Sequence, residues 1–432
     1  MERNWLRIGP SLNELVAEIK DGRKGPRKEV AVVIPTFNRE QMLRKHLMKL
    51  SNQSFKDFDV VIVYSPTDRF IEDVSNLSIV HIRRKEDIGS AGGFYLGEKF
   101  CLQEGYEKII LADDDCLPVS ENLIDELVKN LEGGSGLVFP RIQNNEKNRG
   151  RTNRIIAQYG GLRADTLKAV GLTYLPFYQA GEDIELYYRI IEHKVEVSFI
   201  DAVAFHPPLP CFLTLPPRLT FYYHRGSLIF HHLRRQIYKL FFVSGIFLWS
   251  GLAISFVNRR LAGAVIDGSI NGLALNFESE PKEYGSEPKN DSTNHKTDTF
   301  LIQIPGWEET PETAPGYFKH IFGMVVAILA KLPGRIHSCF GRDILIEGRF
   351  GIGEIPLALV ARSAAWKSKT GENIISKGNN YWLSPIFAIA LMVALPLMFI
   401  LGFLLTSYGM LKMSLSGISS EGYGLQERSV RK

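Results

Sequence analysis

The sequence contains only four cysteines in 432 residues, and no two of them form a C-x-x-C pair. Cysteines this scattered argue against a disulfide framework and a zinc site, and they predict free thiols in a reducing compartment. The net charge of +4 is small, and no basic run alternates with aromatic residues, so a nucleic-acid partner is not expected. Residues 1–20 lack the apolar centre of a cleavable signal peptide.

The first half of the chain has the pattern of a soluble α/β domain. Apolar strands are predicted at 30–34, 57–65, 78–83 and 107–112, and helices at 39–53, 92–104 and 121–130. Buried strands that alternate with helices indicate a largely parallel sheet covered on both faces.

The second half contains two long stretches without a charged residue, 240–258 and 378–411. Each is long enough to cross a bilayer, which takes about 20 apolar residues. A buried core helix is the alternative, and it is more credible for the first stretch. The apolar residues 322–330 are too short to span alone and would lie in the interface or form a hairpin. The basic residues around these stretches leave open whether there are two crossings or a third near 318–334.

These shifts in composition predict the following division of the chain. It consists of an N-terminal extension (1–29), a soluble α/β domain (30–215), a basic and aromatic interfacial segment (216–239), a transmembrane helix (240–258), a polar loop (259–317), a membrane-proximal region (318–377), a second transmembrane helix (378–411) and a tail (412–432).

Three consecutive carboxylates, Asp113, Asp114 and Asp115, follow the fourth predicted strand. Ligands of open α/β sheets bind beyond the carboxyl ends of the strands, so these aspartates are candidates for a Mg²⁺ or Mn²⁺ site that also contacts a phosphate. Taken alone, a triple aspartate is more often a solvated turn in which one Asp caps the next helix.

Three further segments accompany the aspartates. The glycine-rich residues 87–100 allow close backbone approach just before a helix. "GED" opens a helix, so Asp183 lies where the helix dipole favours an ionised carboxylate suited to a general base. His206 ends a strand and could supply a neutral nitrogen ligand to a metal. Each segment also has an ordinary structural explanation, namely a tight turn, an acidic first helical turn or a structural histidine.

The segments "VVIPTFNRE", "IGSAGGFYLG", "ADDDC", "AGEDIELYYRI" and "AFHPP" occur in the order found in family 2 glycosyltransferases with the GT-A fold. This sequence resembles that family over roughly residues 30–225, and "GSAGGF" followed by "DDD" is most similar to galactofuranosyltransferase-like members. The resemblance implies a nucleotide-diphospho-sugar transferase domain with a Rossmann-like α/β fold, followed by a membrane-associated helical region.

The resemblance also implies roles for individual residues. Asp113 and Asp115 would form the D-x-D pair that binds the metal, His206 would complete the metal shell, and Asp183 would be the catalytic base, with Glu182 and Glu185 as the next candidates. The donor site would comprise Pro35, Thr36, Asn38, Asp68, Gly92, Gly93, Asp113, Asp114 and Arg225. "FYYHRGS" matches the family's Tyr-Tyr-x-x-Arg-Asn segment, with Gly226 in place of the Asn.

The implied function is an inverting, metal-dependent transfer of a hexose from a nucleotide diphosphate sugar to a hydroxyl of a lipid-linked or cell-surface glycan. A UDP-sugar is favoured, with UDP-galactofuranose among the candidates, and the catalytic domain would face the cytoplasm at the cell membrane. Two alternatives remain: a polyprenyl-phosphate sugar synthase on the same fold, and a membrane-anchored binding protein without activity.

Overall fold

A computed structural model of the protein describes most of the first half of the chain and parts of the second. The described residues are 9–71, 76–143, 151–152, 155–207, 216–234, 240, 243–245, 247–248, 251, 259–275, 343–347, 363–368, 371–377, 397, 400, 401, 404 and 407. They belong to two compact units, one formed by residues 1–209 with 418–432 and the other by residues 210–417. Each unit is described by itself.

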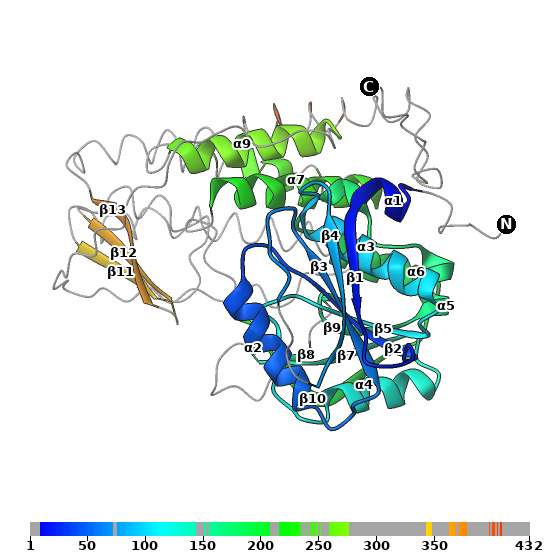
Figure 1. The fold of residues 1–432 in the computed structure, drawn as a ribbon. Helices are drawn as coiled ribbons and strands as arrows, with labels where there is room; N and C mark the ends of the chain where they lie inside the picture. The colour runs from blue at the N-terminus through cyan, green and yellow to red at the C-terminus, as the bar shows by residue number, and fades with distance from the viewer. Residues whose placement is uncertain are drawn as a thin grey trace. The chain divides into compact units, whose positions relative to one another are not determined.

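The first unit is built around one mixed β-sheet (Figure 1). Its strands are β1 Val16–Gly22, β2 Val30–Pro35, β3 Phe58–Tyr64, β4 Ser78–Arg84, β5 Lys108–Ala112, β6 Leu117–Pro118, β7 Leu137–Gln143, β8 Arg151–Thr152, β9 Gln158–Arg163 and β10 Val197–Phe205. They lie in the order β1-β4-β3-β2-β5-β9-β7-β10-β6, with β8 paired to β7. The four predicted strands are confirmed as β2, β3, β4 and β5.

The sheet is mixed, whereas we predict a largely parallel one. Strands β2, β3, β4 and β5 run parallel to their neighbours within that set, and β7 is parallel to β10. Strand β9 is antiparallel to both β5 and β7. The sheet also begins before residue 30, because β1 pairs antiparallel with β4. Exposed side chains dominate β1, so it lacks the apolar run from which the other strands are predicted.

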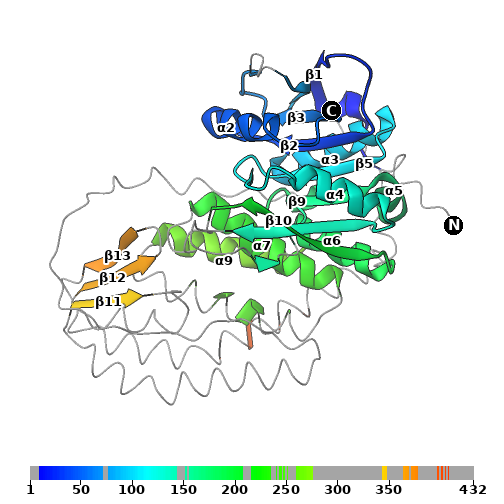
Figure 2. The same ribbon diagram turned by 90° about the horizontal axis from the view of Figure 1, so that it is seen from below.

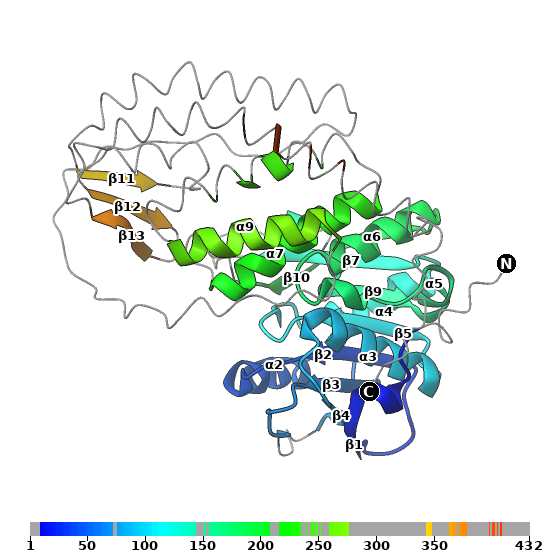
Figure 3. The same cartoon turned by 90° about the horizontal axis from the view of Figure 1, so that it is seen from above.

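Helices cover both faces of this sheet. They are α1 Leu12–Leu15, α2 Glu40–Ser51, α3 Gly89–Glu104, α4 Leu123–Glu132, α5 Ala164–Val170, the 3₁₀ turn Leu175–Phe177 and α6 Glu182–Glu192. Alternate residues of β2 face opposite ways: Val33 joins a core with α3, α5 and α6, whereas Val32 joins one with α2 and α4. Helix α3 lies against β2 and β3 (Figure 3), and α4 lies against β7 and β10 (Figure 2).

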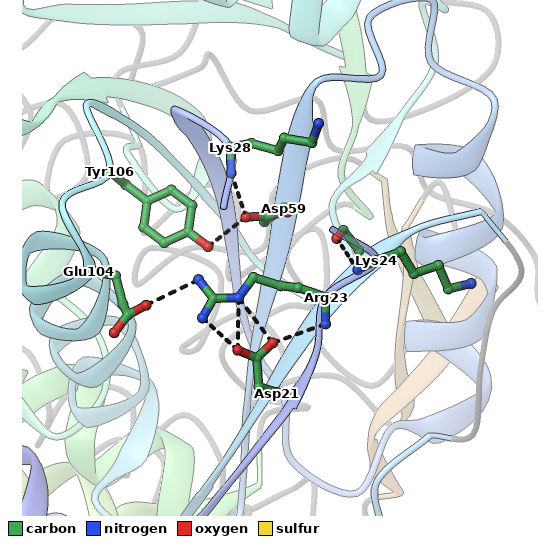
Figure 4. Close-up of polar contacts among 8 residues, drawn as sticks. Asp21, Arg23, Lys24, Lys28, Asp59, Glu104 and Tyr106 are labelled. Atoms are coloured by element: carbon green, nitrogen blue, oxygen red, sulfur yellow. Dashed lines mark hydrogen bonds and ion pairs between the residues drawn. The ribbon is translucent and has the colours of Figure 1, made fainter. Parts of the chain in front are cut away.

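A polar cluster lies at the amino ends of the parallel strands of the sheet (Figure 4). Arg23 pairs with Asp21 at 2.5 Å and with Glu104 at 3.1 Å. The Tyr106 hydroxyl donates to the buried Asp59 carboxylate at 2.8 Å. Ligands of open α/β sheets bind at the opposite edge, beyond the carboxyl ends of the parallel strands.

The described part of the second unit contains α7 Pro217–Leu233 and α9 Arg259–Leu273, together with a small sheet of β11 Asp343–Glu347, β12 Ser363–Ser368 and β13 Gly371–Lys377. Helices α7 and α9 contact each other closely, since a Cβ on Gly268 would lie 2.4 Å from the Phe221 carbonyl oxygen. Helix α9 occupies the start of the segment for which we predict a polar loop, because buried Leu261 and Val265 give it an apolar face.

No helix within the described ranges combines the length and apolar character that a membrane crossing needs. The predicted spans, 240–258 and 378–411, fall largely outside the described residues, and the segment 276–342 lies outside them entirely. The predicted interfacial segment 216–239 is described up to residue 234, where it forms α7, and its position at a membrane surface stays a prediction.

Candidate active site

The three aspartates begin directly after β5, at the carboxyl ends of the parallel strands. The backbone N–H of Asp113 donates to the Ala157 carbonyl at 2.7 Å, and the N–H of Cys116 donates back to the Asp113 carbonyl at 3.0 Å. These two bonds fold the segment into a tight turn, so successive side chains point in different directions. Asp113 and Asp115 are half-buried, whereas Asp114 is buried.

Strand pairing brings His206 to this turn. Phe205, the last residue of β10, pairs with Leu117, which lies two residues after Asp115. One oxygen or nitrogen atom each from Asp113, Asp115 and His206 lies within 4.8 Å of the others. The structure therefore brings together the three residues predicted as metal ligands, although His206 lies about 90 residues after the two aspartates.

The hydrogen bond of the His206 ring fits metal binding. Its Nδ1 lies 2.7 Å from the Pro207 carbonyl oxygen, which can only accept, so Nδ1 carries the proton. Nε2 then lies on the side of Asp115, 3.5 Å from its Oδ1. A divalent cation between these two atoms would be bound by both. Two carboxylates and one imidazole suit Mn²⁺ or Mg²⁺, with Mn²⁺ better matched to the nitrogen.

Asp114 is turned away from this ligand set. Its Oδ2 accepts a hydrogen bond from the Thr36 hydroxyl at 2.9 Å, and its Oδ1 pairs with Arg39 at 3.0 Å. Burial raises its pKa, and the nearby positive charge of Arg39 opposes that rise. Thr36 was predicted to flank the nucleotide, and the structure gives it a direct contact with the aspartate turn.

The "GED" segment opens α6 as predicted. Gly181 precedes the helix with φ +100°, a conformation that favours glycine, and Glu182 and Asp183 form the first turn. Burial raises the pKa of Asp183. The charge of Asp183 also contributes to the raised pKa of Asp113, after burial and the charges of the adjacent aspartates. The predicted base therefore lies within electrostatic range of the predicted metal ligands.

The side chain of Glu182 is less exposed to solvent than that of Asp183. Its side chain is buried and its Oε1 accepts a hydrogen bond from Ser90 at 2.5 Å. Burial and then the charge of Asp183 raise the pKa of Glu182, which favours its protonated form. Ser90 belongs to the glycine-rich segment, so the start of α3 supports the start of α6.

The glycines of α3 allow the helix to lie close to β2. A Cβ on Gly93 would lie 2.6 Å from Pro35 Cβ, and one on Gly97 would lie 2.2 Å from Val33 Cγ1. Gly92 is crowded by Ile88, the residue directly before α3. Helix–sheet packing thus accounts for Gly93 and Gly97, and the nucleotide contact predicted for Gly92 and Gly93 stays a prediction.

Asp68 connects the loops that follow β2 and β3. One carboxylate oxygen accepts from the backbone N–H of Asn38 at 2.9 Å, and the other accepts from Ser65 N–H at 3.2 Å. Asn38 adopts φ +54°, which these contacts help to hold. The nucleotide contacts predicted for Asn38, Asp68 and Pro35 stay predictions.

Arg225 belongs to α7 of the second unit. It is buried, and its guanidinium carbon lies 4.9 Å from the centre of the Tyr222 ring. Its predicted contact with a diphosphate stays a prediction.

Arg39 is the residue at the aspartate turn that sequence reasoning missed. Its Nη1 lies 3.0 Å from Asp114 Oδ1 and 2.8 Å from Asp115 Oδ2. The only signal in the sequence is that it directly follows Asn38 in a segment already assigned to the site. Nothing in the sequence relates it to residues 75 and 76 positions away.

Comparison with known proteins finds similarity over the part of the chain that contains most of this site. Residues 31–185 match the family model described as "Glycosyl transferase family 2". The chain is 24% identical over 196 residues to galactofuranosyltransferase GlfT1 of Mycolicibacterium smegmatis, covering 38% of this chain and 65% of that protein. It is also 24% identical over 215 residues to GlfT1 of Mycobacterium tuberculosis strain H37Rv, covering 42% of this chain and 70% of that protein.

Two solved structures resemble the chain at low similarity. TarS 1–349 of S. aureus in complex with UDP has 17% identity and a TM-score of 0.37, covering 46% of this chain and 64% of that chain. Mannosyltransferase PcManGT from Pyrobaculum calidifontis in complex with GDP-Man and Mn²⁺ has 13% identity and a TM-score of 0.38, covering 66% of this chain and 82% of that chain.

Proposed function

We propose that this protein, which carries a family 2 glycosyltransferase domain over residues 31–185, transfers a hexose from a nucleotide diphosphate sugar to a hydroxyl of a lipid-linked or cell-surface glycan, with inversion. The observation that carries the proposal is the grouping of Asp113, Asp115 and His206 within 4.8 Å, in electrostatic range of a separate carboxylate, Asp183. Metal ligands and a base are the two elements that such a transfer requires.

Asp113, Asp115 and His206 would hold a Mn²⁺ or Mg²⁺ ion, which supplies charge stabilisation for the departing diphosphate when bound. Asp183 accepts the proton of the acceptor hydroxyl. The oxygen of that hydroxyl forms the new bond to the anomeric carbon as the bond from that carbon to the diphosphate breaks. A single displacement without a covalent intermediate inverts the anomeric centre, by the logic that holds for inverting glycosidases.

The two adjacent acids are suited to different protonation states. Burial raises the pKa of Asp183, which makes its carboxylate a stronger base than an exposed aspartate. Burial and the charge of Asp183 raise the pKa of Glu182, and its protonated form adds no second negative charge beside the base. Pairs of acids whose surroundings separate their pKa values are typical of sites that need one base.

The proposed donor is a UDP-sugar, with UDP-galactofuranose as the first candidate. Its support is the similarity to the mycobacterial galactofuranosyltransferases, at 24% identity. The test is a screen of nucleotide sugars by thermal shift with Mn²⁺ present, followed by product analysis with lipid-linked acceptors that end in a hydroxyl. Polyprenyl phosphate is the discriminating acceptor: if it alone is glycosylated, the protein is a polyprenyl-phosphate sugar synthase. If no UDP-sugar binds and none is hydrolysed with Mn²⁺, the transferase proposal fails.

The proposed location is the cell membrane, with the catalytic domain on the cytoplasmic side, where nucleotide sugars are made. The uncharged stretches 240–258 and 378–411 support it. Leu397, Ile400, Leu401 and Leu404 are helical, exposed and spaced to share one helix face. A tag at the N-terminus should react with a membrane-impermeant probe only after cells are opened. Labelling in intact cells would contradict this orientation.

A further inference from the structure

Arg39 holds two of the three consecutive aspartates at once. A single nitrogen, Nη1, lies 3.0 Å from Asp114 Oδ1 and 2.8 Å from Asp115 Oδ2. The backbone of Arg39 is fixed at the start of α2, where its carbonyl accepts the Leu43 N–H at 3.0 Å. The side chain therefore extends from a fixed point to the aspartate turn.

The two oxygens of Asp115 have different partners. Oδ2 bonds to Arg39, whereas Oδ1 lies 3.5 Å from His206 Nε2. The His206 ring is itself held by the bond from Nδ1 to the Pro207 carbonyl. The contact between Arg39 and Oδ2 restricts the rotation of the Asp115 carboxylate, with Oδ1 facing the imidazole.

Asp114 strengthens this arrangement from the other side. It is buried, and Thr36 holds its Oδ2 at 2.9 Å, so its Oδ1 is a fixed acceptor for the guanidinium. Because Nη1 contacts both carboxylates, Asp114 fixes the position of Arg39 relative to Asp115, although Asp114 is not one of the three predicted metal ligands. Burial alone would lower the pKa of Arg39, but the charges of Asp114 and Asp115 outweigh it, so the guanidinium stays charged.

We propose that Arg39 is a positioning residue of the metal centre, which presets Asp115 so that Oδ1 is the atom offered to the divalent cation. Outer partners of this kind orient a metal ligand before the metal arrives, and their loss typically reduces metal affinity about 10–100-fold. The inference rests on the proposed metal site and adds to it a residue that does not touch the metal.

The test is a titration of the full-length protein with Mn²⁺ in the absence of nucleotide. Binding is measured from the electron paramagnetic resonance signal of the Mn²⁺ that remains free. Arg39→Met should weaken Mn²⁺ binding by about 10–100-fold. Arg39→Lys should bind Mn²⁺ nearly as well as the unchanged protein, because a single charged nitrogen suffices for the shared contact. Arg44→Met is the matched control. Arg44 lies on α2, which begins directly after Arg39, and it forms an exposed ion pair with Glu40 at 2.8 Å. Its loss should leave Mn²⁺ affinity unchanged.

Each other outcome has a defined meaning. If Arg39→Met binds Mn²⁺ as tightly as the unchanged protein, Arg39 does not position the metal ligand and the proposal is wrong. If the variant binds Mn²⁺ more tightly, Arg39 competes with the metal and the proposal is also wrong. Arg39→Gln provides a second neutral variant if circular dichroism shows that Arg39→Met is unfolded. If both neutral variants are unfolded while Arg39→Lys folds, Arg39 is a structural counter-ion and the proposal is also overturned. If the unchanged protein binds no Mn²⁺, the proposed metal site itself fails.

Discussion

Asp183 and Asp115 are acids with different tasks, and the difference can be measured. A base acts only in the chemical step, whereas a metal ligand also contributes to donor binding. We expect Asp183→Asn to lower kcat by about 10²–10⁴-fold, the usual contribution of a general base, and to leave the affinity for nucleoside diphosphate with Mn²⁺ nearly unchanged. Asp115→Asn should weaken both. Calorimetric titration beside steady-state rates provides the comparison.

The opposite pattern would reassign the roles. If Asp183→Asn abolishes nucleotide binding, the "GED" segment belongs to the donor site. If turnover is normal, the base lies elsewhere. Glu182 would then be the next candidate, since Glu185 is held by Arg189 at 2.8 Å.

Glu98 should make stability depend on pH in an unusual direction. It is fully buried on α3, and burial raises its pKa from 4.5 to about 7. A raised carboxyl pKa stabilises the fold at low pH, and that contribution, roughly 3 kcal/mol, is lost as the pH rises from about 4.5 through 7. Glu98→Gln should remove this dependence, so that the variant equals the unchanged protein near pH 4 and exceeds it near pH 8.

The substitution is conservative because both bonds of Glu98 can persist. The Thr173 N–H and hydroxyl each donate to one carboxylate oxygen at 2.7 Å, and an amide can accept from the N–H and donate to the hydroxyl. Urea unfolding across the pH range measures the effect, with the exposed Glu121→Gln as a control. Equal pH dependence in all three proteins would exclude an effect of Glu98 ionisation.

At the residue level, the sequence was sufficient to predict a residue of the candidate site where its side chain follows a recognisable strand or opens a helix. Asp113, Asp115, Asp183 and His206 satisfy that condition, and the structure brings the first two together with His206. Arg39 does not, because its partners lie on another loop and only the folded sheet brings them near. The glycines of α3 were ambiguous, since packing against a strand and approach to a phosphate both require a missing side chain.

The contact between α3 and β2 is the element most sensitive to added volume. A Cβ on Gly97 would overlap the stiff side chain of Val33, 2.2 Å away. Gly97→Ala should lower the free energy of unfolding by about 1–3 kcal/mol through overpacking. Gly133→Ala is the control, because Gly133 has φ −69° and only ordinary contacts at 3.4 Å. Thermal or urea unfolding would contradict the argument if the two variants lost equal stability.

Among the elements, helices α2, α3 and α4 and the parallel strands β2 to β5 were predicted, whereas β1, β7, β9 and helices α5 and α9 were not. Helix α2 follows from buried Leu43, Leu47 and Leu50 at helical spacing. Strand β9 contains two adjacent glycines, Gly160 and Gly161, and adopts φ +64° at Tyr159, so it has none of the usual strand signals. Its direction between β5 and β7 depends on long-range pairing, which no local pattern specifies.

At the scale of the molecule, the two units suggest separable functions. We expect a fragment of residues 1–209 to fold and to bind nucleoside diphosphate with Mn²⁺, because the unit boundary leaves the sheet, Asp183 and His206 intact. The same fragment should lose turnover on lipid-linked acceptors if residues beyond 209 associate with the membrane. Calorimetry and vesicle-based assays measure the two properties. A fragment that fails to bind nucleotide would mean that the second unit completes the donor site.

Strand β1 also affects how the protein behaves at high concentration. Its exposed positions include Glu18, Lys20 and Asp21, and it pairs along only one side, with β4. An edge strand with many charged side chains pairs poorly with a strand of another molecule. Without β1, the apolar run of β4 around Ile79 and Val80 would become the border of the sheet. The charged outer strand therefore protects the protein against sheet-to-sheet aggregation during its expression and purification.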